Sequence, residues 1–182
     1  MALWIARHAT PLIASGVCYG TLDVTADAQH TLQAAHALAQ GLPEHCKVWV
    51  SPLQRCMQLA DALSGIQPEL KPQIDTRLRE MDFGSWEGVA WDAIPLAAMQ
   101  AWTDDFGAHR FGGVESANEV LTRVADVWDA ARQHPDKDQV WITHAGVARA
   151  VQLLSIGIRW VESASQWPTD APSYGEWWRI DF

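Results

Sequence analysis

The sequence has few of the features that mark disulfide-linked, metal-bound or membrane-spanning proteins. It contains three cysteines, Cys18, Cys46 and Cys56, whose scattered spacing forms neither a CxxC motif nor a disulfide framework. We interpret them as free, buried thiols. No apolar run approaches the roughly 20 residues that cross a bilayer, and no charged segment followed by an apolar stretch precedes a cleavage site. We therefore expect a cytoplasmic protein with no membrane partner.

Positive charge is scarce as well. The 13 Lys and Arg residues are outnumbered by 22 Asp and Glu residues, which gives a formal net charge of -9. Because affinity for nucleic acid comes mostly from neutralising phosphates with Lys and Arg, nucleic acid is not an expected partner. The chain also lacks internal repeats, low-complexity tracts and linker-like changes in composition. Residues 1–182 are therefore expected to form a single domain.

Three short apolar runs provide most of the fold prediction. Residues 3–6, 48–50 and 140–142 are apolar, and each run is followed by a polar turn and then by residues with helical periodicity. This alternation is typical of parallel strands joined by crossover helices. The last residues, EWWRIDF, are expected to add a final strand. The sequence therefore predicts an α/β fold.

Capping patterns indicate where the helices begin. Ser51 with Gln54, and Ser116 with Glu119, match the capping box in which a hydroxyl and a side-chain oxygen satisfy the first free N–H groups of a helix. The first box places Arg55 in the first turn of its helix. Two further helices are expected, over residues 25–40 and 145–157.

The segment from residue 67 to residue 113 has no clear periodicity. Proline, glycine and aromatic residues are mixed in it, which predicts long excursions over the sheet. Two interpretations of its aromatic side chains remain open: they wall a pocket for an apolar organic group, or they pack the segment onto the sheet. These side chains are Trp86, Trp91, Trp102, Phe106 and Phe111.

The three apolar runs share a second feature, because nitrogen-bearing side chains follow each of them. Arg7 and His8 follow the first run, Arg55 lies just past the second, and His144 directly follows the third. In an open parallel sheet, ligands bind beyond the carboxyl ends of the strands. Two planar guanidinium groups, two imidazoles and nearby helix N-termini together suit a tetrahedral anion. The ligand implied is phosphate.

An acid is needed to turn phosphate binding into catalysis. The stretch RLREMDFGSWEG, residues 77–88, carries Glu80 on a short segment that turns at Gly84. Asp82 and Glu87 are nearby carboxylates. Glu80 could protonate a leaving alkoxide, provided that it lies beside the anion site.

These residues resemble the histidine phosphatase superfamily, also called phosphoglycerate mutase-like. The resemblance implies a three-layer α/β/α sandwich with a mixed, mainly parallel sheet. It implies that His8 is the nucleophile that becomes phosphorylated and that Glu80 protonates the leaving group and then activates water. The phosphoryl oxygens would be held by Arg7, Arg55 and a protonated His144, with neither a metal nor a cofactor. The matching stretches are Arg7-His8, SPLQR at 51–55, LREMDFGSWEG around Glu80, GVES at 113–116 and THAG at 143–146.

The sequence departs from the family pattern in the loop after the nucleophile. Ala9 replaces a glycine, so an L-residue must fit the backbone there. Ala145 stands where a second branch of the superfamily has an aspartate, which leaves Glu80 as the acid that the resemblance supports. Three residues remain open as the hydroxyl that completes the phosphate pocket: Thr10, Ser15 and Thr21.

The expected activity is metal-independent hydrolysis of a small phosphomonoester. The short length and the stretch GVCYGTLD resemble α-ribazole phosphatase-like members, so α-ribazole phosphate or a related metabolite is one candidate substrate. Two alternatives stay open, a phosphoglycerate mutase-type phosphoryl transferase and an inactive phosphate-binding module. A metalloenzyme is disfavoured because two arginines would repel a divalent cation and no HxH or HExxH spacing occurs.

Overall fold

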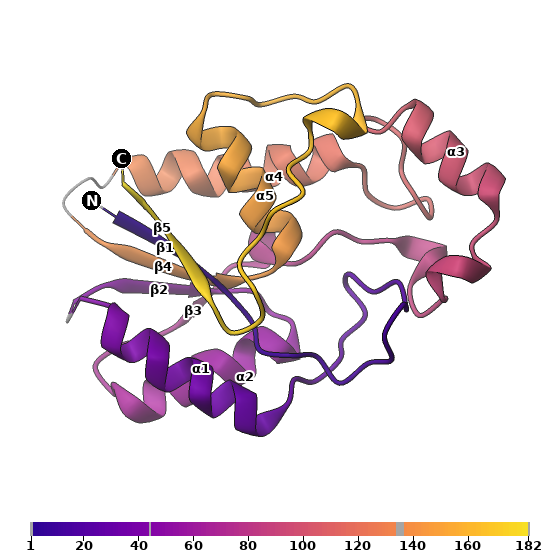
Figure 1. Cartoon of the computed structure of the whole chain (residues 1–182). Coiled ribbons are helices and arrows are strands. Elements are labelled where there is room, and N and C mark those ends of the chain that lie inside the picture. The colour runs from indigo at the N-terminus through magenta and orange to yellow at the C-terminus, as the bar shows by residue number, and fades with distance from the viewer. Residues whose placement is uncertain (1, 44, 134–136, 182) are drawn as a thin grey trace.

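A five-stranded sheet forms the centre of the described chain, a computed structural model that covers residues 2–43, 45–133 and 137–181. The strand order is β3-β2-β4-β1-β5 (Figure 1). β1, β2, β3 and β4 all run parallel to one another, whereas the edge strand β5 pairs antiparallel with β1. The mixed, mainly parallel sheet predicted from the sequence is confirmed. The strands are β1 Ala2–Arg7, β2 Lys47–Val50, β3 Gln73–Ile74, β4 Gln139–Thr143 and β5 Trp177–Asp181.

Helices cover both faces of this sheet. α1 (Ala28–Gly41) and α2 (Gln54–Ile66) lie on one face, and α4 (Ala117–Arg132) and α5 (Ala145–Ser155) lie on the other (Figure 1). A strand covered on both faces has no solvent side, so its sequence does not alternate between apolar and polar residues. All of β4, and all of β1 except Arg7, is accordingly buried. The predicted three-layer arrangement is confirmed.

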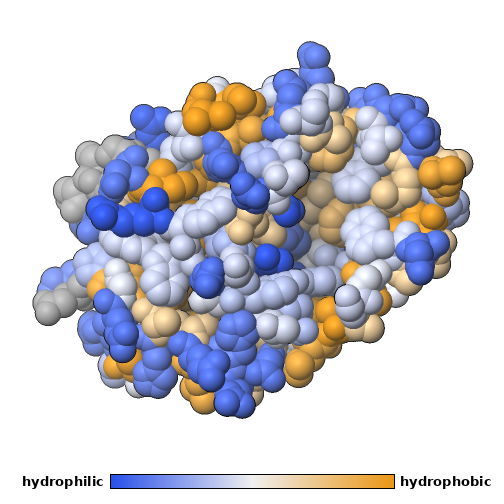
Figure 2. Space-filling model, viewed as in Figure 1, coloured by the Kyte–Doolittle hydropathy of each residue, from blue (hydrophilic) through white to orange (hydrophobic). Residues whose placement is uncertain are grey.

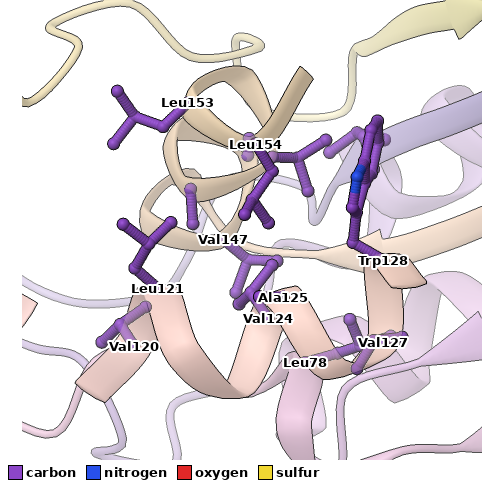
Figure 3. Packing of buried hydrophobic residues seen from close by; sticks show 14 of the residues in the cluster. Leu78, Val120, Leu121, Val124, Ala125, Val127, Trp128, Val147, Leu153 and Leu154 are labelled. Atoms are coloured by element: carbon purple, nitrogen blue, oxygen red, sulfur yellow. The ribbon is translucent and has the colours of Figure 1, made fainter. Parts of the chain in front are cut away.

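Aliphatic packing fixes α4 and α5 against each other and against the sheet. Figure 3 shows Leu121 and Val124 of α4 beside Val147 and Leu154 of α5. Fully burying each such side chain contributes about 1.5–3 kcal/mol. The predicted capping box at Ser116 is present and opens α4. Because α5 directly follows β4, this packing also fixes the helix start that borders the candidate site.

Two helix starts differ from the prediction. α1 begins at Ala28, where the Asp27 carboxylate accepts the His30 N–H, rather than at residue 25. α2 begins at Gln54, and Ser51 does not cap it. Instead, the Gln54 N–H donates to Oδ1 of Asp23 at 2.7 Å. The helix itself and the place of Arg55 in its first turn are as predicted, but the predicted start at Ser51 was wrong because this cap comes from a residue distant in the sequence.

The long segment between β3 and α4 is mostly irregular, as predicted, but includes an unpredicted helix, α3 (Leu96–Asp104). An aromatic cluster links α3 to the rest of the segment: Phe111 is fully buried against Trp91 and Trp102, at ring-centroid distances of 6.0 and 4.3 Å. None of the helices in the described ranges has the length and apolarity needed to cross a membrane. Short 3-10 turns occupy Thr76–Leu78, Gly84–Trp86, Trp91–Ala93 and Ala164–Gln166.

Candidate active site

The carboxyl ends of β1, β2 and β4 bring the predicted nitrogen-bearing side chains together. Arg7 ends β1 and His8 follows it, while His144 directly follows β4. Arg55 reaches this edge from the first turn of α2. The rings of His8 and His144 lie 5.2 Å apart between centroids, and Nε of Arg55 is 3.2 Å from Nε2 of His8. The juxtaposition predicted from the strand ends is therefore present.

His8 is held with one ring nitrogen bonded to the backbone and the other directed into the site. Its Nδ1 lies 2.7 Å from the carbonyl oxygen of Ala9, which requires the proton to be on Nδ1. Nε2 then carries the lone pair and accepts from Arg55. Burial, together with the charges of Arg55 and Arg7, lowers the pKa of His8 to about 3, although the Ala9 hydrogen bond opposes the shift. The imidazole is therefore neutral near pH 7, as a nitrogen nucleophile must be.

Ala9 fits the loop without strain. No described non-glycine residue has a positive φ, so this position does not require the left-handed conformation that favours glycine. Ala9 is fully buried, and its carbonyl orients the His8 ring. The replacement of glycine by alanine thus leaves the His8 ring held by a backbone hydrogen bond.

Arg55 is fully buried, and backbone carbonyls rather than carboxylates hold it. Its terminal nitrogens donate to the carbonyls of Gly20 and Leu22, and its Nε donates to His8. Among the described residues, no carboxylate lies within ion-pair distance of Arg55 or of Arg7. The guanidinium of Arg7 lies 3.9 Å from the ring centre of Tyr174, and its buried Nε has no hydrogen-bond partner. Desolvated cations without counter-ions make this an anion site.

His144 is fully buried and lies behind His8. Its Nε2 shares a hydrogen bond of 2.7 Å with the Ser51 hydroxyl and lies 3.4 Å from the Cys56 sulfur. Burial and the neighbouring charge of Arg55 hold the pKa of His144 well below its usual value. His144 is therefore neutral in the phosphate-free site, because a buried imidazole beside two arginines loses its proton. A protonated His144 on the phosphoryl oxygens stays a prediction.

Ser51 and Cys56 are functional neighbours that sequence reasoning did not identify. Ser51 was expected to cap a helix, and the Cys56 thiol is free and buried like those of Cys18 and Cys46. The prediction of three free, buried thiols is confirmed. The spacing of Ser51, four residues before Arg55 and directly after β2, was the available signal.

A cavity of about 340 Å³ opens beside His8. Figure 2 shows the molecule hollowed to the right of centre, on the side where Figure 1 draws α3. Arg7, His8 and Glu80 reach the cavity wall, whereas Arg55 and His144 are not among its lining residues. The aromatic walls are Tyr19, Phe83, Trp102, Phe106, Trp167 and Tyr174.

The aromatic segment thus divides between the two interpretations left open by the sequence. Trp102 and Phe106 face the cavity. Phe111 is buried in the aromatic cluster, and Trp86 and Trp91 pack on it without lining the cavity. Some aromatic side chains of the segment therefore line the cavity, and the others pack against one another and hold the segment in place.

Glu80 lies across the cavity at the start of α5. Its Oε2 accepts the Gly146 N–H at 3.2 Å, and its Oε1 accepts the Met81 N–H at 3.0 Å. A Cβ on residue 146 would lie 2.3 Å from Oε1 of Glu80, so only glycine leaves room for this contact. The THAG stretch therefore positions both His144 and Glu80.

A half-buried clamp joins the N-terminal loop to the Glu80 segment. The Glu87 carboxylate accepts the N–H groups of Gly20, Thr21 and Leu22 and that of Phe83, at 2.8–3.0 Å. Because Arg55 binds carbonyls of the same turn, Glu87 and Arg55 hold it from both sides. A Cβ on Gly20 would come within 1.8 Å of the Met81 carbonyl oxygen, which shows how closely the two segments cross.

A second clamp supports Glu80 from behind. Nε of Arg123 donates to the Glu115 carboxylate at 2.7 Å, and the guanidinium also donates to the carbonyls of Arg77, Arg79 and Glu80. Glu115 is buried and accepts the Asp82 N–H at 3.1 Å. Glu115 therefore lies beneath the Glu80 segment.

The candidate hydroxyl residues lie outside the main cavity. Thr10 bonds to Nδ1 of His30, Ser15 is exposed, and Thr21 contacts Glu87. The hydroxyls on the cavity wall belong instead to Tyr19 and Tyr174, which share a hydrogen bond of 2.7 Å.

Fold and site together define an α/β protein whose parallel strands gather arginine and histidine side chains at their carboxyl ends. A family model described as the histidine phosphatase superfamily, branch 1, matches residues 3–169. The chain belongs to this superfamily.

Proteins named glucosyl-3-phosphoglycerate phosphatase are among its relatives. The one from Mycolicibacterium vanbaalenii is 29% identical over 153 residues, which cover 77% of this chain but only 64% of that protein, less than two thirds. The one from Mycobacterium tuberculosis (strain CDC 1551 / Oshkosh) is 27% identical over 190 residues, covering 89% of this chain and 84% of that protein. A solved structure of mycobacterial glucosyl-3-phosphoglycerate phosphatase complexed with VO3 has a TM-score of 0.78 at 25% identity, covering 98% and 91% of the two chains.

Proposed function

We propose that this protein hydrolyses small organic phosphomonoesters through a phosphohistidine formed on Nε2 of His8. The observation that carries the proposal is the state of His8: it is buried and neutral, with Nδ1 held by Ala9 and Nε2 beside the buried Arg55. The VO3 complex of the mycobacterial relative supports a phosphate-like ligand in such a site. The metal-free character of the reaction stays a prediction.

In the first step, the lone pair on Nε2 of His8 attacks phosphorus and the bond to the leaving oxygen breaks. Arg55 moves its hydrogen bond from Nε2 to a phosphoryl oxygen, and Arg7 takes another oxygen. The Glu80 carboxyl gives its proton to the departing alkoxide. Charge on the equatorial oxygens is thereby neutralised in a site that excludes water, where hydrogen bonds and charges act most strongly.

In the second step, the Glu80 carboxylate removes a proton from water, and the resulting hydroxide attacks phosphorus. The P–N bond breaks, its electron pair returns to Nε2, and inorganic phosphate leaves. Glu80 is then protonated and ready for another cycle. His144, neutral before substrate binds, contributes a hydrogen bond and packs against the His8 ring.

The organic part of the substrate is proposed to lie against the aromatic walls of the cavity. Phe83, Trp102, Phe106 and Trp167 offer flat faces for a heterocycle or for the apolar face of a sugar. α-Ribazole phosphate, the candidate raised by the sequence, carries both kinds of group. Glucosyl-3-phosphoglycerate is the second candidate substrate, because the relatives' name contains it. This compound carries a sugar and a carboxylate.

The deciding experiment measures hydrolysis of p-nitrophenyl phosphate with a metal chelator present, together with trapping of an acid-labile phosphoenzyme by rapid quench. Wild-type protein should turn over and accumulate label. His8→Ala should lose both by at least about 10³-fold. The matched control is His36→Ala, which removes an imidazole that is exposed on α1 and should leave both unchanged.

Three other outcomes of this experiment would support a different function or mechanism. Phosphate binding without turnover on p-nitrophenyl phosphate, α-ribazole phosphate and 3-phosphoglycerate would make the protein a phosphate-binding module. Transfer of label to a second hydroxyl of the product would make it a mutase. Loss of activity on adding chelator would contradict the metal-free reaction.

A further inference from the structure

Arg149 is a cation at the active-site cavity that the proposed reaction does not use. It lies on α5, three residues after Gly146 and four after Ala145, and both of those residues also line the cavity. Residues three and four apart share one face of a helix. The same helix face that accommodates Glu80 therefore carries the Arg149 guanidinium into the cavity.

The hydrogen bonds of Arg149 are incomplete. Nη2 donates to the carbonyl of Thr169 at 3.0 Å, while the buried Nε has no hydrogen-bond partner. In the described ranges, no carboxylate lies within ion-pair distance of this guanidinium. Arg123, by contrast, is an equally deep arginine whose charge is met by Glu115. Arg149 thus has N–H donors that remain free to bind a ligand in the cavity.

The electrostatic surroundings of Arg149 also favour the binding of an anion beside it. Burial lowers the pKa of Arg149 and the charge of Arg7 lowers it further, while Glu80 opposes the shift. Two half-buried cations at one cavity repel each other, and a second anionic group would offset that cost.

The position of Arg149 separates it from the phosphate end. Its hydrogen bond to Thr169 ties it to the segment that also contributes Trp167, one of the aromatic walls. The phosphate end already has Arg7, with Arg55 behind His8. A single planar guanidinium matches a carboxylate, which it binds through two parallel hydrogen bonds, better than it matches a second phosphate dianion.

We propose that Arg149 binds a carboxylate on the organic part of the substrate and so selects phosphomonoesters whose leaving group is anionic. The inference rests on the proposed phosphatase function and narrows its substrate class. Arg149 is a specificity-determining residue in this scheme, since it contacts the substrate away from phosphorus.

The test compares two substrates that differ in one group. 3-Phosphoglycerate carries a carboxylate where glycerol 3-phosphate carries a hydroxymethyl group, and both release an alkoxide. We expect wild-type protein to prefer 3-phosphoglycerate by about 10-fold or more in kcat/KM, as befits a hydrogen-bonded charge. Arg149→Gln should collapse this ratio to about 1, mainly through KM, and Arg149→Lys should retain part of it. Arg159→Gln, which removes an exposed arginine paired with Asp129, should leave the ratio unchanged.

The outcomes separate this inference from the proposed function. A wild-type ratio near 1, or an Arg149→Gln variant that loses activity equally on both substrates, would overturn the carboxylate role while leaving His8-dependent hydrolysis intact. Absence of His8-dependent hydrolysis of p-nitrophenyl phosphate would overturn the proposed function and this inference with it. Circular dichroism and thermal unfolding of Arg149→Gln identify a folding defect, in which case the ratio measured with Arg149→Lys decides.

Discussion

The two ends of the active-site cavity are built in different ways. At the phosphate end, Arg7, His8 and His144 stand on or directly after central strands, so sheet register fixes their positions. At the leaving-group end, Glu80 and most of the aromatic walls come from irregular segments, and Trp102 comes from α3. Those segments are fastened by the carboxylate clamp of Glu87 and by the Arg123–Glu115 pair rather than by a sheet.

This difference in construction assigns the reaction at phosphorus to one end of the cavity and the selection of the substrate to the other. Groups that must meet phosphorus within a fraction of an ångström are placed on stiff elements, where small errors of position are least. Groups that meet the organic part lie on loops that can vary without disturbing the sheet. Variants at the first end should therefore change kcat/KM for every phosphomonoester, whereas variants at the second should change the ranking of substrates.

The sharpest test of the phosphate end is Arg55→Gln. The variant removes a phosphate ligand and the donor to the Gly20 and Leu22 carbonyls. We expect kcat/KM to fall by about 10³-fold or more for every phosphomonoester, and by similar factors for each. A loss confined to one substrate would break the proposed separation. Arg159→Gln again serves as the matched control.

Glu80→Gln tests the acid at the opposite end. An alkyl leaving group needs a proton, whereas p-nitrophenolate leaves without one. We expect phosphoenzyme formation from glycerol 3-phosphate to slow by about 10²–10³-fold, with a much smaller effect for p-nitrophenyl phosphate. Asp82→Asn, which removes a neighbouring carboxylate that does not line the cavity, should show no such dependence on the leaving group. Equal losses on both substrates would mean that Glu80 does not donate a proton to the leaving group and only holds the neighbouring backbone in place.

Glu87→Gln examines how the leaving-group end is fastened. The Glu87 carboxylate accepts hydrogen bonds from four backbone N–H groups, and an amide with one acceptor oxygen cannot satisfy them all. We expect a loss of about 1–3 kcal/mol in the free energy of unfolding, measured with denaturant. Glu69→Gln, at an exposed position, should change it little. An unchanged unfolding midpoint in Glu87→Gln would mean that the loop is held by other contacts.

The smallest expected effect concerns pH. Burial lowers the pKa of His8 to about 3 and that of His144 well below 6.5, whereas both titrate near 6.5 in the unfolded chain. As the pH falls below about 6.5, the unfolded state binds protons that the folded state does not, so stability falls, by up to about 1.4 kcal/mol per pH unit for each histidine. Denaturant unfolding of His8→Gln between about pH 7 and pH 5 should show a shallower decline than wild type. The same slope in both proteins would mean that folding does not shift the pKa of His8.

Sequence patterns predicted the sheet and the strand-end residues because both depend on local order along the chain. Uninterrupted apolar runs identified the buried strands, and a parallel sheet brings their carboxyl ends to one edge. The capping box at Ser116 was equally local and equally reliable. The start of α2 was not, because Asp23 caps it from a distant loop.

The amino-acid sequence by itself therefore determined the parallel sheet, the convergence of Arg7, His8, Arg55 and His144, and the family. Tertiary structure alone decided the charge of His144, the fit of Ala9, the clamp made by Glu87 and the approach of Arg149 to the cavity. The physical reason is that burial, counter-charge and hydrogen-bond partners depend on residues far apart in the chain. A pattern of residue types records which groups are present, but only packing decides what surrounds them.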